Sequence, residues 1–402
     1  MLPAALRLLV IGWSTLGGMF PASAADLPVR SVPTRPTAPS SVPAPPVAAA
    51  VTPKATAAPV QRAVSTPRVK LPSPELRSTA KSPAASPAPA TLVYIGAKEM
   101  ARTLNLTPKW DPATRQLTLL DAQVTLVLER DQRETDLNGM RVFLGAPTVW
   151  RNGELAVSQI DFQRLLLPAI RPLNLSGPTP GLKVIAIDPG HGGRDTGKVN
   201  AGQKVLEKEA TLDTARRLKL LLEAQGFTVV LTRSDDRFVE LAERPEIATR
   251  ESADLFISLH FNAVEAEATR VTGVEVYTMT PQFQLSADRR LDDHVPVFNP
   301  GNAMDPWNTV LGYHLHRALL SSLKVPDRGL KRGRYVVLRL ARCPAVLIEA
   351  GFLSHDGEAR RIATPQYRQE IAAAIAAGVH NYVTTVAAVR AQQAGLRKAA
   401  KK

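Results

Sequence analysis

Three side chains that commonly bind metal ions lie at the ends of elements that the sequence predicts. His191 stands in the glycine-rich turn "DPGHGGRDTG", which follows the aliphatic run "VIAI", and His260 follows the apolar run "DLFISL". Glu207, in "VLEKEATLD", opens a segment with helical periodicity. Two imidazoles and one carboxylate are a common catalytic zinc set, which leaves the fourth tetrahedral position for water. The three residues therefore predict a metal site.

A fourth polar residue, Glu349, lies inside the hydrophobic run "CPAVLIEAGFL". Burying an isolated carboxylate there is costly unless the carboxylate is paired or used. A metal ion lowers the pKa of its water to about 7, and a nearby carboxylate can take the proton and return it to a leaving nitrogen. We expect the apolar neighbours of Glu349 to raise its pKa by desolvation. The four residues together predict metal-assisted hydrolysis.

Each of these residues, taken alone, also fits a simpler interpretation. A histidine in a loop is usually a solvated polar residue, and one that closes a buried strand, such as His260, can be a hydrogen-bonded core residue. The helix dipole favours a carboxylate in the first helical turn, as at Glu207. A phosphate-binding turn is a further alternative, but "DPGHGGRDTG" has neither G-x-G-x-x-G nor the lysine of a P-loop. The chain also lacks the metalloprotease pattern H-E-x-x-H.

Strands and helices alternate after a joint rich in Pro and Gly at residues 171–181. The predicted strands are "KVIAI", "FTVVLT", "DLFISLH", "GVEVYTM", "YVVLR" and "AVLIEA", and the predicted helices span about 206–225, 240–250, 308–323 and 366–382. This alternation predicts an α/β fold, with a mostly parallel sheet and helices on both faces. Ligands of such sheets collect beyond the carboxyl ends of the strands, where we expect His191, His260 and Glu349 to meet.

The sequence divides into five segments. Residues 1–24 have the pattern of a secretory signal peptide, for which an uncleaved membrane anchor is the alternative. Residues 25–91 are rich in Pro and Ala and are expected to form a disordered, extended linker. Residues 92–175 form a predicted small α+β module, residues 181–385 the α/β domain and residues 386–402 a basic tail. We expect no stable transmembrane span once the signal peptide is cleaved.

The distribution of charge argues against a nucleic-acid partner. The chain carries a net charge of +14, but residues 1–91 hold nine Lys/Arg and two Asp/Glu, and residues 383–402 hold five Lys/Arg and no acid. Most of the excess charge therefore lies in the two ends, which suits anionic envelope polymers or lipid head groups, or a tail that has no partner. Cys343 is the only cysteine, so the exported chain has no internal disulfide, and its apolar surroundings predict a buried side chain.

The α/β domain resembles a known enzyme family. The motifs that carry the resemblance are "IDPGHGGRDTG", "EKEATLDTARRL", "TRSDDRFVELAERPEIA", "ADLFISLHFNA", "GVEVY", "DRGLKRGRYVVLR" and "PAVLIEAGFLS". In order and approximate spacing they resemble the zinc-dependent N-acetylmuramoyl-L-alanine amidases, which cleave the amide between N-acetylmuramic acid and L-alanine in peptidoglycan. By this resemblance His191, Glu207 and His260 are the Zn²⁺ ligands, Glu349 is the catalytic carboxylate and Asn262 helps to shape the substrate site.

The resemblance also implies partners and a location. Peptidoglycan is the expected substrate, in cell-wall remodelling or cell separation, and an activator protein is a second partner that the resemblance allows. Secretion to the cell envelope is expected, with the periplasm as the compartment. Residues 92–175 resemble the copper-amine-oxidase N-terminal-like module, which implies an accessory or stalk role. This module contains no His or Cys, so we expect no copper chemistry from it.

The sequence departs from the family pattern at two places. His355 stands where the family usually has asparagine in "GFLSN", which puts any polar contact of that side chain in doubt. The segment 280–308 is long, and in some relatives an inhibitory helix occupies this place; Asp292, Asp293 and His294 are the candidates for such a role. A surface loop that shapes the cleft is the alternative. A noncatalytic adaptor with the same fold remains the alternative function, although none of the four site residues is missing.

Overall fold

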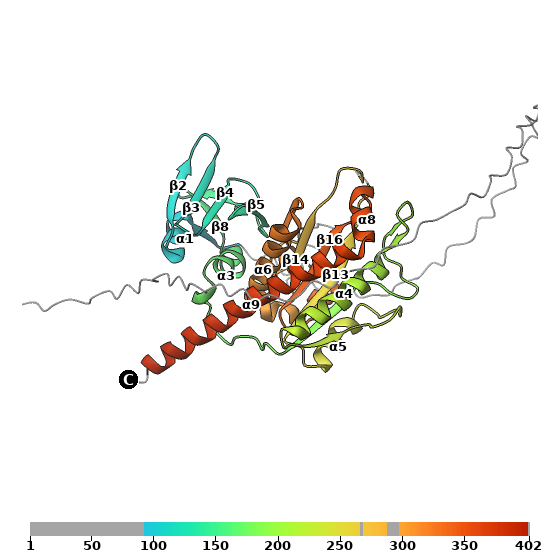
Figure 1. The fold of residues 1–402 in the computed structure, drawn as a ribbon. Coiled ribbons are helices and arrows are strands. Elements are labelled where there is room, and N and C mark those ends of the chain that lie inside the picture. The colour runs from blue at the N-terminus through green and yellow to red at the C-terminus, as the bar shows by residue number, and fades with distance from the viewer. Residues whose placement is uncertain (1–91, 266–267, 288–296, 401–402) are drawn as a thin grey trace, which may run out of the picture. The chain divides into compact units, whose positions relative to one another are not determined.

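The computed structural model describes residues 92–265, 268–287 and 297–400 (Figure 1). The predicted signal peptide and linker, residues 1–91, lie outside the described residues. The same holds for Asp292, Asp293 and His294, the candidates for inhibition. The described residues therefore belong to the predicted α+β module, the α/β domain and most of the predicted basic tail.

A mixed sheet forms the centre of the α/β domain. Its strands are β9 (Val184–Pro189), β12 (Thr228–Leu231), β13 (Leu255–Asn262), β14 (Val274–Met279), β15 (Asp327–Gly333) and β16 (Ala345–Phe352). They lie in the order β12-β9-β13-β16-β14-β15. Neighbouring strands are parallel except for β14 and β16, which are antiparallel. The predicted mostly parallel sheet is confirmed.

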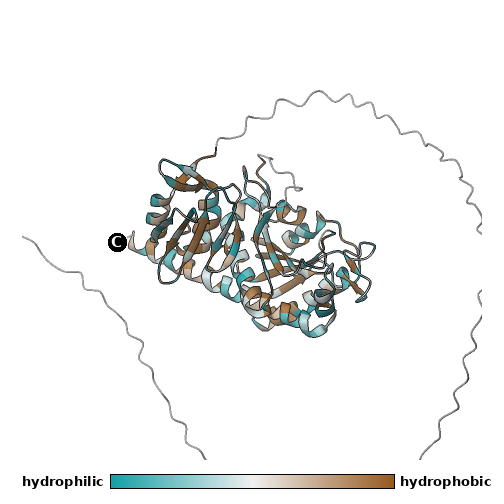
Figure 2. Cartoon of the chain, turned by 90° about the horizontal axis from the view of Figure 1, so that it is seen from above, coloured by the Kyte–Doolittle hydropathy of each residue, from teal (hydrophilic) through white to brown (hydrophobic). Residues whose placement is uncertain are grey.

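Helices cover both faces of this sheet, as predicted. They are α4 (Glu207–Ala224), α5 (Glu243–Arg250), α6 (Asp305–Leu323), α7 (Val336–Leu340), α8 (Asp356–Ala363) and α9 (Pro365–Ala399). Successive side chains of a strand point to opposite faces. Accordingly, Ile185 and Ile187 of β9 pack in the core that α4, α6 and α9 share, whereas Ala186 packs with α5 and α7. Figure 2 shows hydrophobic residues along the strands and both hydrophobic and hydrophilic residues along the helices.

One predicted strand is a helix in the structure. The run "YVVLR" is rich in β-branched and aromatic residues, which favour strands by local propensity. The chain nevertheless forms α7 there, and Val337 and Leu338 are buried against the sheet. The strand of this region is β15, which includes a single large apolar residue, Leu330, and lies between β14 and a strand of the α+β module. The pairing of β15 with its two neighbouring strands has therefore outweighed the local preference of "YVVLR" for a strand.

The last helix is longer than the predicted 366–382. Residues 386–399 of the predicted basic tail continue α9 (Figure 1). Val386 and Val389 in this extension are buried. Arg390 donates a hydrogen bond to the Pro180 carbonyl, and Gln393 donates one to the Leu175 carbonyl. Two features explain the extension. The segment is rich in alanine and other good helix formers, and its side chains contact the joint between the module and the α/β domain.

The composition of α9 also meets the criteria for a membrane span. Of the described helices, α9 alone is long and apolar enough to cross a bilayer by length and composition. Half of its most apolar window is buried inside the structure, however, and it packs on α4 and α6. These contacts are those of a core helix.

The α+β module extends the same sheet. Its elements are β1 (Tyr94–Gly96), α1 (Ala97–Leu104), β2 (Thr107–Asp111), β3 (Gln116–Leu120), β4 (Thr125–Glu129), β5 (Glu134–Leu137), β6 (Met140–Phe143), β7 (Val149–Arg151), β8 (Glu154–Ser158), α2 (Gln159–Asp161), a π-helix (Phe162–Leu166) and α3 (Leu167–Ile170). Strands β2 to β6 form an antiparallel meander, and β6 pairs in parallel with β15 through Val142 and Leu330. Within the described residues, the result is a sheet of 11 strands.

A buried ion pair joins this module to β15. The Arg332 side chain donates to Asp161 at 2.7 Å, and their side chains are 3% and 0% exposed. Asp161 also accepts hydrogen bonds from the Gly145 and Ala146 backbone amides. We predict that Asp161→Ala lowers the free energy of unfolding by about 3–5 kcal/mol, because it leaves the guanidinium buried without its partner.

Urea denaturation of the full chain measures this loss. Glu134→Ala is the matched control within the module, because Glu134 pairs with Arg141 at a site where both side chains are more than 40% exposed. Exposed pairs contribute about 0–1 kcal/mol, so the control should stay close to the wild type. Equal losses in both variants would contradict a special role for the buried pair.

The single cysteine is buried, as predicted. Cys343 is 9% exposed and packs in the core beneath α5 and α7. Burial raises the pKa of its thiol to about 12. A thiol of this kind is a packing residue rather than a nucleophile.

Candidate metal centre

The turn after β9 brings His191 close to the other predicted ligands because two glycines leave room for them. A Cβ atom at Gly190 would lie 2.3 Å from Cε1 of His260, and one at Gly197 would lie 2.6 Å from Cδ2 of His191. His191 itself has a φ of 61°, a left-handed conformation that residues other than glycine rarely adopt and that is found often at functional sites. Gly190 and Gly197 therefore allow the imidazole rings of His260 and His191 to lie close to the backbone of the turn.

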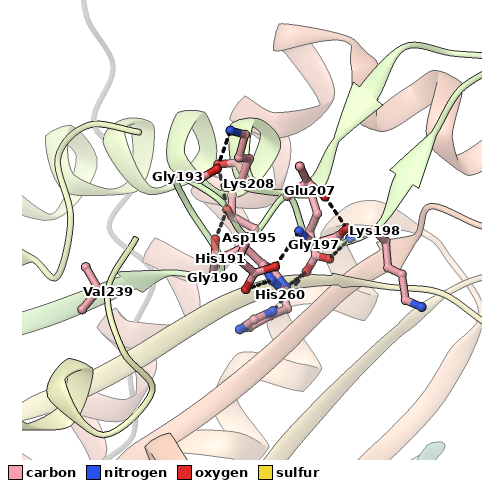
Figure 3. A network of polar contacts seen from close by, with 12 residues as sticks. Gly190, His191, Gly193, Asp195, Gly197, Lys198, Glu207, Lys208, Val239 and His260 are labelled. Atoms are coloured by element: carbon pink, nitrogen blue, oxygen red, sulfur yellow. Dashed lines mark hydrogen bonds and ion pairs between the residues drawn. The ribbon is translucent and has the colours of Figure 1, made fainter. Parts of the chain in front are cut away.

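The three predicted ligands converge on one point (Figure 3). Nε2 of His191 and Nδ1 of His260 each lie 3.0 Å from Oε1 of Glu207, and one ligand atom of each residue lies within 4.8 Å of the others. Two atoms bound tetrahedrally to one zinc ion at about 2.0–2.1 Å lie about 3.3 Å apart. The donor types and their spacing therefore fit a zinc ion.

Backbone groups and burial hold the carboxylate of Glu207 in place. Glu207 is 2% exposed, and its carboxylate accepts hydrogen bonds from the backbone amides of Lys198 at 2.8 Å and Phe261 at 3.1 Å. Burial by itself would raise the pKa of Glu207, but contacts with His191 and His260 outweigh it and hold the pKa well below its usual range. The carboxylate of Glu207 is therefore ionised and held in one orientation.

Asp195 orients the ring of His191. Its Oδ2 lies 2.8 Å from Nδ1 of His191, and its Oδ1 accepts a hydrogen bond from the Gly197 amide at 3.0 Å. A carboxylate that accepts the second N–H of a ligating histidine fixes the tautomer, so that the other nitrogen is free to bind a metal. In the predicted metal site, Nε2 of His191 would then be the atom that faces the ion.

We predict that Asp195→Ala weakens zinc binding by about 10–100-fold, as the loss of such orienting partners usually does. Competition with a chromophoric chelator measures the affinity. The matched control is Asp236→Ala, since Asp236 accepts hydrogen bonds from the Gly193 amide of the same turn and from Lys208 of α4 without touching a predicted ligand. An unchanged affinity for Asp195→Ala would show that His191 is oriented by other means.

Glu349 lies beside the three ligands on β16. It pairs in register with His260 of the parallel strand β13, so the two side chains emerge on the same face of the sheet. Within the described part of the chain, its buried Oε2 has no hydrogen-bond partner. Burial raises the pKa of Glu349 well above its usual value, and the negative charges of Glu207 and Glu275 add to the rise. This direction agrees with the expectation from its apolar sequence neighbours.

One cavity of about 630 Å³ unites the predicted site. It is lined by His191, Glu207, His260, Glu349 and Asn262, with Arg334 and Tyr335 among the other residues of its wall. Asn262 uses both of its polar atoms within the protein: Nδ2 donates to Oε1 of Glu275 and Oδ1 accepts from the Ala263 amide, each at 2.7 Å. All the predicted site residues thus meet in one cavity.

The structure adds three polar residues to this region. Asp195 contacts His191, and Glu275 and Lys331 form an ion pair next to Asn262. The sequence gives a signal for Glu275, since it stands between apolar residues in "GVEVY" as Glu349 does in "AVLIEAG". Asp195 and Lys331 lie in polar stretches, where their types and positions do not distinguish them from solvated residues.

The two departures from the family pattern lie outside the ligand set. His355 caps α8, because its Nδ1 accepts a hydrogen bond from the Glu358 amide at 3.1 Å, a role that asparagine also fills well. The described beginning of the segment 280–308 is held by Arg334, which donates to the carbonyls of Pro281 and Gln284. The segment is thus attached to a side chain of the cavity wall.

Comparison with known proteins gives consistent matches. The family model described as N-acetylmuramoyl-L-alanine amidase matches residues 185–381. The N-acetylmuramoyl-L-alanine amidase LytC of Bacillus subtilis strain 168 is 30% identical over 261 residues, which cover 65% of this chain and 47% of LytC. AmiA of Escherichia coli K12 is 32% identical over 225 residues, which cover 50% of this chain and 76% of AmiA.

The chain is also similar to solved structures. The N-acetylmuramoyl-L-alanine amidase AmiC2 of Nostoc punctiforme is 32% identical, with a TM-score of 0.42, and the match covers 51% of this chain and 99% of that structure. The matched residues 185–381 include all three metal-ligand candidates and Glu349. The chain therefore belongs to the N-acetylmuramoyl-L-alanine amidase family, whose members are metal-dependent hydrolases that act on peptidoglycan.

Proposed function

We propose that this protein is a zinc-dependent N-acetylmuramoyl-L-alanine amidase. It hydrolyses the amide between the lactyl group of N-acetylmuramic acid and L-alanine, in cell-wall remodelling or cell separation. The observation that carries the proposal is the meeting of two imidazoles and a carboxylate with the half-buried carboxylate of Glu349 in one cavity. Membership of the amidase family supports the choice of bond.

His191, Glu207 and His260 are the residues that would hold the zinc ion. When bound, zinc supplies Lewis acidity, which polarises a scissile carbonyl and lowers the pKa of water. The mixed set of imidazole and carboxylate donors is one that zinc commonly takes. Asp195 and the backbone amides that bind Glu207 keep these donors in position before any ion arrives.

Glu349 moves the proton in the proposed reaction. Its carboxylate accepts a proton from the attacking water and delivers it to the nitrogen of L-alanine as the amide breaks. Its Oε2 is engaged by none of the described residues, and its raised pKa suits a group that must hold a proton between the two steps. The cavity wall that includes Asn262 would receive the muramoyl group or the stem peptide.

The proposal places the protein in the cell envelope, in the periplasm. The signal-peptide pattern of residues 1–24 supports export, and the basic ends suit attraction to an anionic polymer. Peptidoglycan is the proposed partner, and an activator protein is a second one. The module at residues 92–175 is then an accessory part, and it shares the sheet of the catalytic domain.

The products of digestion test the proposed bond. Purified peptidoglycan is incubated with the zinc-loaded protein, and the soluble and insoluble fractions are analysed by mass spectrometry. We expect free stem peptides with an L-alanine amino terminus and glycan strands that keep the lactyl group. Release of disaccharides, or cleavage within the peptides, would contradict the proposed bond specificity. Binding to peptidoglycan without any release would support the noncatalytic adaptor instead.

A further inference from the structure

A buried ion pair lies immediately behind the cavity. Glu275 of β14 is 2% exposed and is absent from the cavity wall. Its carboxylate accepts hydrogen bonds from Asn262 at 2.7 Å and from the Tyr277 hydroxyl at 3.1 Å, and it forms an ion pair with Nζ of Lys331. The three donors come from β13, β14 and β15, so one carboxylate ties three strands together.

Glu275 is also the cross-strand neighbour of Glu349. The two residues pair in register on the antiparallel strands β14 and β16, and Glu349 pairs on its other side with His260 of β13. Residues paired in this way point to the same face, with Cβ atoms about 4.5–5.5 Å apart. Glu349 therefore lies between a predicted metal ligand and a second buried carboxylate.

Two carboxylates side by side, one buried and one half-buried, repel each other unless a cation compensates for one of them. Lys331 supplies that cation, and its side chain is only 16% exposed. The Lys331 ammonium group pairs with Glu275, the cross-strand neighbour of Glu349.

We propose that Glu275 is a positioning residue for the reaction, since it holds the Lys331 ammonium away from Glu349 and fixes Asn262 at the cavity wall. Glu349, which lines the cavity, is thereby left without a cationic partner. This inference rests on the proposed function, because it assigns Glu349 the transfer of the proton. By this inference, the ion pair between Glu275 and Lys331 serves the reaction as well as the stability of the fold.

The Glu275→Gln variant separates these two roles. Glutamine has the same shape and keeps an oxygen that Asn262 and Tyr277 can donate to, but it has no charge to hold Lys331. Lys331 is then expected to pair with Glu349. As a result, kcat should fall about tenfold or more while KM changes little. This loss is smaller than the about 10²–10⁴-fold loss that follows removal of a general base. Zinc content should stay at the wild-type level.

The double variant Glu275→Gln with Lys331→Met supplies the decisive comparison. It removes the unpaired ammonium, so kcat should recover to within about tenfold of the wild type, although a second buried residue has been changed. Glu275→Asp, which keeps the charge, should lose less activity than Glu275→Gln. A crystal structure of Glu275→Gln should show Nζ of Lys331 within hydrogen-bond distance of Glu349, a readout that does not depend on activity.

The inference fails if folded, zinc-loaded Glu275→Gln keeps the wild-type kcat, or if Lys331 keeps its position in that crystal structure. If the single variant does not fold, the double variant carries the test, since it buries no unpaired charge. A kcat for the double variant as low as that of Glu349→Gln would then overturn the inference. Failure of the proposed function itself is distinguishable, because the wild-type protein would release no stem peptides.

Discussion

Glu349→Gln is expected to lower kcat by about 10²–10⁴-fold, the usual contribution of a general acid and base. Glutamine has nearly the same size and shape as glutamate, but it cannot accept the proton of the attacking water. Zinc content should not change, because Glu349 is outside the predicted ligand set and its Oε2 has no hydrogen-bond partner among the described residues. The measurement is the rate of appearance of new L-alanine amino termini from peptidoglycan, with zinc content determined on the same sample.

A second buried glutamate provides the control for this variant. Glu358 is 4% exposed, and its carboxylate accepts hydrogen bonds from the backbone amides of Gly273 and Phe352. Glu358→Gln should cost stability, yet each folded molecule should remain active. A comparable loss of kcat in both variants would mean that Glu349→Gln lowers activity by disturbing the folded structure. The assignment of proton transfer to Glu349 would then be wrong.

His260→Ala is expected to abolish both zinc binding and activity. Only two of the three converging donors remain, and two protein ligands are fewer than catalytic zinc sites use. The zinc content after dialysis should fall from about one ion per chain to a small fraction of that value. Atomic absorption measures the metal, and the release of L-alanine amino termini measures the activity.

The control for this loss is an exposed histidine of α9. His380→Ala removes an imidazole without touching the cavity, so its zinc content and activity should match those of the wild type. If His260→Ala keeps a full complement of zinc, the metal is held elsewhere, and the ligand set His191, Glu207 and His260 is incorrect.

The sequence predicts the ligand set and Glu349 because each of these residues contrasts with its neighbours. His191 and His260 follow aliphatic strands, Glu207 begins a helix, and Glu349 stands inside an apolar run. Parallel strands deliver the residues at their carboxyl ends to the same edge of a sheet. The structure places these side chains around one cavity at that edge.

The contacts that surround these residues could not be predicted from the local sequence. Asp195 lies four residues after His191 in an irregular turn, where spacing does not determine direction, and the pairing of Lys331 with Glu275 requires the register of β14 and β15. The parallel pairing of β6 with β15 likewise joins strands that lie far apart in the chain. The same pairing explains why the strand lies in "DRGLKRG" rather than in "YVVLR".

The central claim is that a metal ion held by His191, Glu207 and His260 works together with Glu349 to cleave the muramoyl amide. The purified protein is incubated with peptidoglycan as isolated, after treatment with a chelator, and after zinc is restored, in parallel with Glu349→Ala. We predict that new L-alanine amino termini appear with the metal-loaded protein, stop with the chelator and return with zinc, and that the variant releases none under any condition. Equal release in all samples would contradict the account.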